Sequence, residues 1–387
     1  MSRPSAHALA VDALRLRGWA FDALSSAGAP APPPPASAAA WGFFNEMEWC
    51  ALPLRARLRD ACVWDSCDAA ARDALTAAAL GEMRRVHSAR EEMAAVAARA
   101  LDRGWKVVVL KGGASVAAGI DVHLADVDLL MCGQDAAAMQ DALAAEGLRG
   151  SPGVGEYGFA ARRPDGVAIE VHESVAALGA TDDALRDAVP LAGFPGLWKL
   201  SGERQLWHVL HHGVARHRDR AGRLREIVVL RHALGAASEA EIAGVEARAR
   251  MAAEAEDLSC VLRMARASQS SDRIERYVRQ RYFLLARWRW LGAARVATAA
   301  LRQTLSISSL LAVPGRPALL RGYLLASTDA PSVLAAGRWL AARHRAAARA
   351  LRIAARLPVL AAAAALAAGA AAEDRLSRRA DEKAPIA

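Results

Sequence analysis

Residues 126–130 are Asp-Val-Asp-Leu-Leu, and this stretch decides which fold we expect for the chain. Its apolar residues alternate with two carboxylates, which is the pattern of a β-strand with one buried face. Side chains two residues apart on a strand point the same way, about 6.7 Å apart along the backbone, so Asp126 and Asp128 share a face. Two carboxylates placed in this way can converge on a hard divalent cation such as Mg²⁺.

A pair of glycines follows the predicted strand that comes earlier in the chain. Residues 106–110 are Lys-Val-Val-Val-Leu, a β-branched run with the length of a buried strand, and residues 114–118 are compatible with a helix. Gly112 and Gly113 therefore occupy a strand-to-helix turn, where positive φ and open backbone N–H groups allow a phosphate to approach closely. Lys111 and Ser115 are candidates to add a cation and a hydroxyl donor to this nucleotide-binding turn.

A third carboxylate lies on a later predicted strand. Residues 168–172 are Ala-Ile-Glu-Val-His and repeat the alternation, so Glu170 and His172 share a face. Together with Asp126 and Asp128, Glu170 would complete a site for two cations, which hold the attacking and leaving oxygens of a phosphoryl transfer. His172 is a candidate to contact phosphate or relay a proton, and a structural hydrogen bond is an equal alternative.

These motifs, with twelve residues between Gly113 and Asp126, resemble the nucleotidyltransferase superfamily. The segments VVVLKGGASVAAG, ADVDLLM and AIEVHESV, with the helical residues 207–212, resemble in particular the bacterial "uncharacterised nucleotidyltransferase" family of minimal polymerase-β-like cores wrapped in helices. The resemblance implies that Gly112 and Gly113 contact the phosphates of a nucleoside triphosphate. It also implies that the metal ligands are the three carboxylates Asp126, Asp128 and Glu170. Relatives often carry an arginine where this chain has Val122.

The reaction implied is Mg²⁺-dependent transfer of a nucleoside monophosphate from a nucleoside triphosphate (NTP), such as ATP, with release of pyrophosphate. Two Mg²⁺ ions are expected, and Mn²⁺ is an alternative. The aspartates would hold the metal that accompanies the triphosphate, and Glu170 would orient or deprotonate the acceptor. Relatives are associated with bacterial polysaccharide and peptide natural-product pathways, which favours a small molecule, a peptide or a saccharide precursor as acceptor. A tRNA- or protein-modifying transferase and a catalytically silent nucleotide-binding module are the alternatives.

Other motifs indicate less. Residues 153–158 match the glycine spacing of dinucleotide-binding proteins, but they follow a predicted helix over 135–146 and precede a predicted hairpin, so we interpret them as turn glycines. The sequence contains neither a Gly-Lys-Ser/Thr phosphate loop nor a His-Glu-x-x-His zinc motif. His208 and His212 share a face of a predicted helix, for which a structural role is favoured over metal or phosphate binding.

The fold expected is α/β (α+β), with a small mixed β-sheet core inside helical regions. The nucleotidyltransferase core covers residues 106–178, between helical regions at 41–105 and 185–356. Residues 1–40 are expected to form a helix, loosely attached through a proline-rich linker, and residues 357–387 an alanine-rich helix and a polar tail.

Composition favours a cytoplasmic protein without a membrane span. The five cysteines form no Cys-x-x-Cys pair, charged residues interrupt residues 1–24, and the apolar stretch 357–372 falls short of the roughly 20 residues that a spanning helix needs. Residues 106–176 hold five basic and ten acidic side chains, whereas the whole chain carries +9. An acidic core needs divalent cations before it accepts a triphosphate, and the basic remainder would attract NTP. RNA is a less favoured partner of the arginine-rich helices, and the sequence leaves the oligomeric state open.

Overall fold

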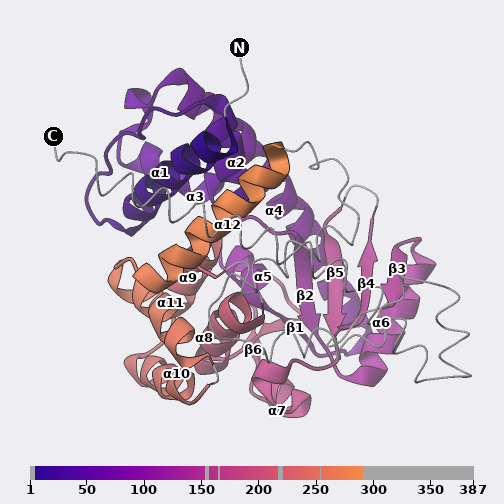
Figure 1. Cartoon of the computed structure of the whole chain (residues 1–387). Coiled ribbons are helices and arrows are strands. Elements are labelled where there is room, and N and C mark those ends of the chain that lie inside the picture. Colours follow the sequence, from indigo (N-terminus) through magenta and orange to yellow (C-terminus); the bar gives the residue numbers. More distant parts are fainter. Residues whose placement is uncertain (1–4, 153–156, 164–165, 217–220, 253, 291–387) are drawn as a thin grey trace, which may run out of the picture. The chain divides into compact units, whose positions relative to one another are not determined.

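A computed structural model describes residues 5–152, 157–163, 166–216, 221–252 and 254–290 of the chain (Figure 1). The chain divides into two compact units. Residues 15–274 form the larger unit, and the described residues of the other are 5–14 and 275–290. In this second unit the ring of His7 stacks on that of Phe283, with 5.4 Å between the ring centroids.

The larger unit is built on one mixed sheet. Its strands are β1 (Val107–Val109), β2 (Asp126–Leu130), β3 (Arg149–Pro152), β4 (Tyr157–Arg162), β5 (Ala168–His172), β6 (Val189–Pro190) and β7 (Leu197–Lys199). The order across the sheet is β3-β4-β5-β2-β1-β7-β6. β2 runs parallel to β5 and β1 parallel to β7, while the other neighbouring pairs are antiparallel.

This sheet confirms the predicted mixed core. The alternating stretch around Asp126 is β2, the run after Lys106 contains β1, and β4 and β5 form the predicted antiparallel hairpin. The glycine-rich segment at 153–158 joins the antiparallel strands β3 and β4, and its residues 153–156 lie outside the described residues. Periodicity does not reveal β6 and β7, because strands of two and three residues are too short to show a repeat.

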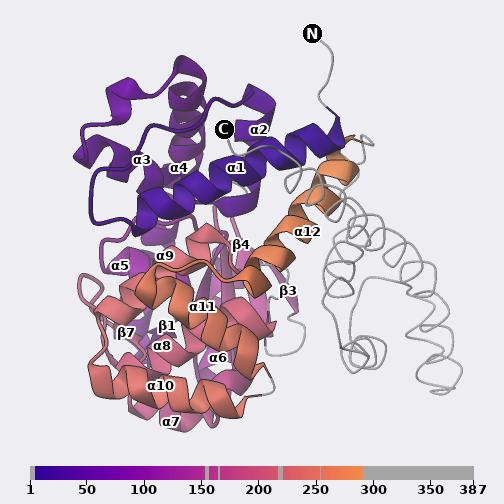
Figure 2. The ribbon, with the colours of Figure 1, turned by 60° about the vertical axis from the view of Figure 1, so that its left-hand side comes forward.

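The helices supply the rest of the described chain. They are α1 (Ala6–Ser25), α2 (Ala38–Glu48), α3 (Ala51–Asp60), α4 (Ala69–Arg103), α5 (Lys111–Ala117), α6 (Gly133–Ala145), α7 (Thr181–Arg186), α8 (Gly202–His211), α9 (Leu224–Gly235), α10 (Glu239–Met251), α11 (Ala255–Ala267) and α12 (Asp272–Trp290). α4 begins where the Asp68 side chain accepts from the N–H of Ala71 and ends at Gly104, whose φ of 68° is readily adopted only by glycine. Helices α8 to α11 pack together, as Figure 2 shows.

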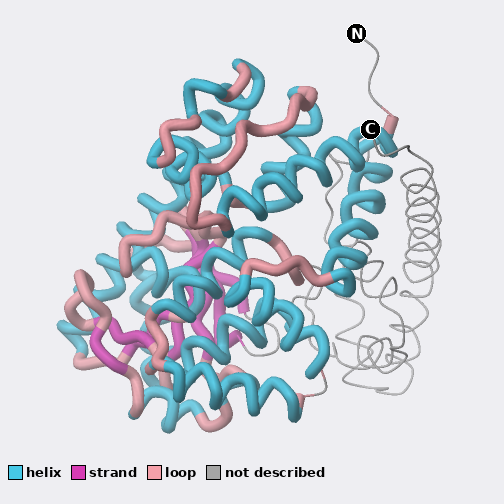
Figure 3. The backbone as a smooth tube through the Cα atoms, turned by 90° about the vertical axis from the view of Figure 1, so that its left-hand side faces the viewer, coloured by secondary structure: helices cyan, strands magenta, loops and turns pink. Residues whose placement is uncertain are grey.

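Helices cover the sheet and bring distant segments to its central strands. α4 packs on β2 and β7, α6 packs on β3 and β4, and α5 lies against β2, α8 and α9. Figure 3 shows the strands, in magenta, among the helices, in cyan. Apolar side chains from β1, β2 and α7, including Val108, Leu130 and Leu185, form a buried core beside Leu200. α5 therefore joins β2, which carries the two aspartates, to helices from the later part of the chain.

Residues 15–25 of α1 are firmly packed, so the loose attachment expected for the first helix is wrong for this part. Arg17 is 2% exposed and donates to the carbonyl of Gly222 at 2.9 Å. Its Nε lies 3.7 Å from Oε1 of the fully buried Glu48, whose Oε2 accepts the N–H of Leu224 at 2.7 Å. The ion pair joins α1, α2 and the start of α9, and this long-range pairing is invisible in the sequence.

Several predicted features lie outside the described residues, among them the apolar stretch 357–372 and the arginine-rich helices. Among the helices that the structure describes, none has both the length and the hydropathy required to cross a bilayer.

Candidate active site

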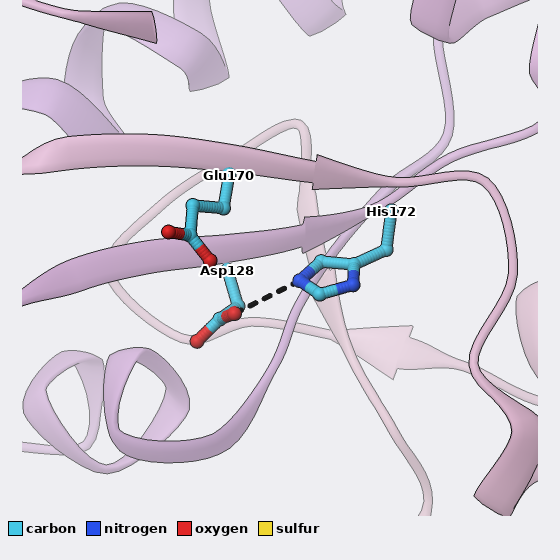
Figure 4. A group of neighbouring side chains, drawn as sticks. All are labelled: Asp128, Glu170 and His172. Atoms are coloured by element: carbon cyan, nitrogen blue, oxygen red, sulfur yellow. Dashed lines mark hydrogen bonds and ion pairs between the residues drawn. The ribbon is translucent and has the colours of Figure 1, made fainter. Parts of the chain in front are cut away.

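Three of the predicted side chains meet at the junction of β2 and β5. The parallel register places Asp128 opposite Glu170 and Leu130 opposite His172. One ligand atom from each of Asp128, Glu170 and His172 lies within 4.8 Å of the others, and Figure 4 shows the two carboxylates side by side with the imidazole directed at Asp128. Strand alternation and parallel pairing together produce this cluster, since each strand turns its polar residues to the same face.

The donor set suits a divalent cation. Two carboxylate oxygens match the preference of Mg²⁺ for oxygen ligands, whereas an imidazole nitrogen is more typical of transition metals. The cluster therefore fits a hard divalent ion through Asp128 and Glu170, while His172 forms a hydrogen bond with Asp128.

Asp128 is a charged carboxylate held by two partners. Its Oδ1 lies 2.7 Å from Nζ of Lys111 and 2.9 Å from Nε2 of His172, and the residue is 5% exposed. Burial acts to raise the pKa of Asp128, but the Lys111 ammonium and the hydrogen bond to His172 hold that pKa well below its ordinary value. Lys111 reaches this position with a φ of 51°, in the left-handed region that non-glycine residues seldom adopt.

Gly112 and Gly113 are both buried in the first turn of α5, and the positive φ expected of them is wrong: Lys111 has it instead. The glycines are required by close packing. A Cβ on Gly112 would lie 2.6 Å from Nη2 of Arg225 and 2.7 Å from Cδ2 of Leu124, and one on Gly113 would lie 2.7 Å from Cγ1 of Val109. Ser115, the predicted hydroxyl donor, is on the same helix and is 2% exposed.

Asp126 is separate from the three-residue cluster. It lies half-buried at the start of β2, two residues before Asp128, and does not belong to the group that meets within 4.8 Å. Its charge acts on Arg225 instead: burial lowers the pKa of this guanidinium, but the nearby carboxylates of Glu226, Asp126 and Asp128 give a net rise.

Arg225 lies in the site, but the sequence does not predict it as a site residue. It comes from α9, and its Nε donates to the carbonyl of His123 at 3.0 Å, across a separation of 102 residues. The ring of His123 stacks on Trp49 at 4.5 Å, and the guanidinium of Arg223 lies 4.2 Å from the centre of the Trp49 ring. No spacing in the chain connects these residues, so only the tertiary structure brings them to the glycine pair.

His208 of α8 and His212, which directly follows this helix, also lie near enough to Asp128 to act on its charge or be affected by it. His208 is 1% exposed, and neither of its ring nitrogens finds a hydrogen-bond partner among the described residues. Burial, followed by the charge of Lys111, lowers the pKa of His208 to about 3, so its imidazole is neutral. The ring of His212 lies 5.8 Å from that of His208, and the charge of His212 contributes to the low pKa of Asp128. His217 lies outside the described residues.

Comparison with known families settles the class of protein to which this site belongs. The model of a family described as "uncharacterised nucleotidyltransferase" matches residues 51–268, which is more than half of the chain. The chain belongs to this nucleotidyltransferase family. The match contains the sheet, the glycine pair, the acidic cluster and Arg225, and family membership supports transfer of a nucleoside monophosphate in general.

Two further comparisons add little. No curated protein matches the chain. Among solved structures, that of the antibiotic-resistance factor ANT(2'')-Ia, determined in solution, is similar at 17% identity over 44% of this chain and 92% of that one, with a TM-score of 0.34. A TM-score this low carries no argument about the site.

Proposed function

We propose that this nucleotidyltransferase moves a nucleoside monophosphate from an NTP to an acceptor, in the presence of Mg²⁺ and with release of pyrophosphate. The cluster of Asp128, Glu170 and His172, with ligand atoms within 4.8 Å, is the observation that supports the proposal most directly. A family member needs such a cluster, because phosphoryl transfer depends on positioning and on neutralising the charge of the phosphates.

Asp128 and Glu170 would hold the divalent cation, and Asp126 would serve a second ion from the same face of β2. When bound, the metal would neutralise the triphosphate and stabilise the charge that develops on the leaving pyrophosphate. His172 would keep Asp128 oriented through its 2.9 Å hydrogen bond, and Glu170 would orient or deprotonate the acceptor.

Lys111 has a second role in this scheme. It neutralises Asp128 through the same oxygen that a cation would use, at 2.7 Å. When a cation occupies that oxygen, Lys111 loses its partner and can turn to the triphosphate, next to Gly112 and Gly113. The first-turn N–H groups of α5 have no acceptor within their own helix, so the glycine pair is the proposed backbone contact to the phosphates.

The acceptor is proposed to be a small molecule, a peptide natural product or a saccharide precursor. The NTP requirement fits a cytoplasmic enzyme. Modification of tRNA or protein and silent nucleotide binding are the competing outcomes of the test below.

The test combines stabilisation and turnover. Thermal unfolding of the intact protein is measured with each NTP, with and without Mg²⁺, and compared with Asp128→Asn and Asp126→Asn. Ligand at 100 times its dissociation constant should add about 2.7 kcal/mol, a shift of several degrees. Asp141→Asn, at an exposed position of α6, is the matched control and should behave like the intact protein.

Each outcome has a clear meaning. A Mg²⁺-dependent shift that both site variants lose supports the proposal and identifies the base. Binding of NTP without Mg²⁺ dependence indicates a silent module, and co-purifying RNA that salt removes steeply indicates a tRNA substrate. Unchanged turnover in both aspartate variants would refute the metal site.

A further inference from the structure

Arg225 is a buried cation whose hydrogen-bonding capacity is only partly used. Its side chain is 13% exposed, its Nε donates to the carbonyl of His123, and its Nη1 lies 2.7 Å from Oε1 of Glu226. Nη2 makes no hydrogen bond to the described residues. A guanidinium with two of its three nitrogens engaged and the third open is already oriented, so it would lose little conformational freedom on binding a ligand.

The open nitrogen faces the glycine pair. Nη2 of Arg225 lies 2.6 Å from the point that a Cβ would occupy on Gly112, so the absence of a side chain there is what admits the guanidinium. α5, which begins with the glycine pair, packs on both α9 and β2. Arg225 is also near enough to Asp126 and Asp128 for both carboxylates to act on its charge. It therefore lies next to the glycine turn and within electrostatic reach of the acidic strand.

Two further arginines add positive charge near His123, whose carbonyl positions Arg225. Burial and the charges of Arg225, Arg85 and Arg223 lower the pKa of His123 to about 3, so this imidazole is neutral. His123 stacks on Trp49, whose ring also contacts the guanidinium of Arg223, and the carbonyl of His123 positions Arg225. A polyanion that binds Arg225 would also lie near the charges of Arg85 and Arg223.

We infer that Arg225 binds the polyphosphate of the NTP through its open Nη2, next to Gly112. The inference rests on the proposed function and adds to it a phosphate-binding residue that lies outside the predicted motifs. A planar guanidinium suits phosphate oxygens better than a lysine does, because it offers several donors in fixed directions.

The experiment separates phosphate binding from a merely structural role. Binding of inorganic tripolyphosphate with Mg²⁺, and of the preferred nucleotide as its monophosphate and triphosphate, is measured by calorimetry on the full chain and on Arg225→Gln and Arg225→Lys. Arg231→Gln is the matched control: it removes a half-buried arginine from the same helix, where the guanidinium donates to the carbonyls of Leu24 and Ala265.

Arg225→Gln should weaken tripolyphosphate and NTP binding by about 10- to 100-fold, the usual effect of one charge-assisted hydrogen bond, and leave the monophosphate affected least. Arg225→Lys should recover part of this loss, since it keeps the charge without the fork. Arg231→Gln should lower the unfolding temperature without changing tripolyphosphate affinity.

Unchanged tripolyphosphate affinity in folded Arg225→Gln would overturn the inference. If that variant does not fold, Arg225→Lys decides: affinity equal to that of the intact protein overturns it. Failure of the proposed function looks different, because the intact protein would then bind neither tripolyphosphate nor any NTP.

Discussion

Replacing Lys111 by methionine tests the site most directly, because it removes the cation that neutralises Asp128. Lys111 and Asp128 side chains are 12% and 6% exposed, and their charged atoms are 2.7 Å apart. Loss of one partner of a buried pair costs about 3 to 5 kcal/mol, since the other charge stays buried without compensation. His172 still donates to Asp128 in the variant, so we expect about 3 kcal/mol, or roughly 6 °C in the unfolding temperature.

The loss should depend on pH in a defined direction. Asp128 has a folded-state pKa well below its ordinary value, and among the causes that lower it Lys111 is the largest. Its contribution to stability is therefore present above the unfolded-state pKa of about 3.9 and is lost as the pH falls towards the folded-state value. The difference between the intact protein and Lys111→Met should be complete at pH 7 and should shrink below about pH 4.

The same substitution should strengthen metal binding, because a cation no longer competes with an ammonium for Oδ1 of Asp128. Urea unfolding measures the stability of the metal-free protein and the stability gained when Mn²⁺ is added. Without metal the variant should be less stable than the intact protein, and it should gain more stability from Mn²⁺. Lys106→Met, at a lysine that lies over the Trp198 ring on another part of the sheet, is the control. The competition between Lys111 and metal would be refuted if Lys111→Met lost the same stability relative to the intact protein with and without Mn²⁺, or if it bound the metal more weakly.

Three other substitutions probe the packing around the site. Glu48→Ala should lower the free energy of unfolding, measured in urea, by about 3 to 5 kcal/mol, because the buried Arg17 and the N–H of Leu224 lose their carboxylate. Glu46→Ala, at an exposed position of the same helix, is the control and should lower it far less. Similar losses in the two variants would contradict the ion pair. Gly112→Ala should lower stability by about 1 to 3 kcal/mol and weaken NTP binding, because the new Cβ would displace Arg225. Gly235→Ala is the control, since a Cβ there would have no atom within 4 Å. Normal NTP affinity in a folded Gly112→Ala would argue against the close approach of Arg225 to Gly112. His208→Leu should leave stability unchanged or raise it by about 1 kcal/mol at pH 7, because it removes a buried imidazole without hydrogen-bond partners in the described chain. A clear loss of stability would instead indicate that the imidazole forms hydrogen bonds through water.

The acidic motif shows how far local pattern reaches. Alternation around Asp126 and Glu170 predicts two strands, and these strands are β2 and β5 with the expected faces. The pattern does not predict the register in which β2 and β5 pair. This register places Glu170 and His172, rather than Asp126, within 4.8 Å of Asp128. A pairing shifted by two residues would keep every face and change the ligand set.

For the glycine pair, the sequence identifies the right residues but predicts the wrong reason for glycine at these positions. Sequence suggests glycine for its backbone freedom, but Lys111 takes the left-handed conformation and Gly112 makes room for Arg225. Space for a side chain that comes from more than 100 residues away cannot be inferred from local sequence.

The sequence by itself determined the family, the mixed sheet and the identity of the acidic strand residues, because strand periodicity and turn residues are local properties of the chain. Tertiary structure alone decided that Lys111 and His172 hold Asp128, that a neutral His208 lies buried beside them, and that Arg225 faces Gly112. These contacts join residues separated by 17 (Lys111 and Asp128) to 113 positions (Gly112 and Arg225). Side chains meet there because helices α5, α8 and α9 pack together, and such packing depends on the shape of the whole unit rather than on any one stretch of it.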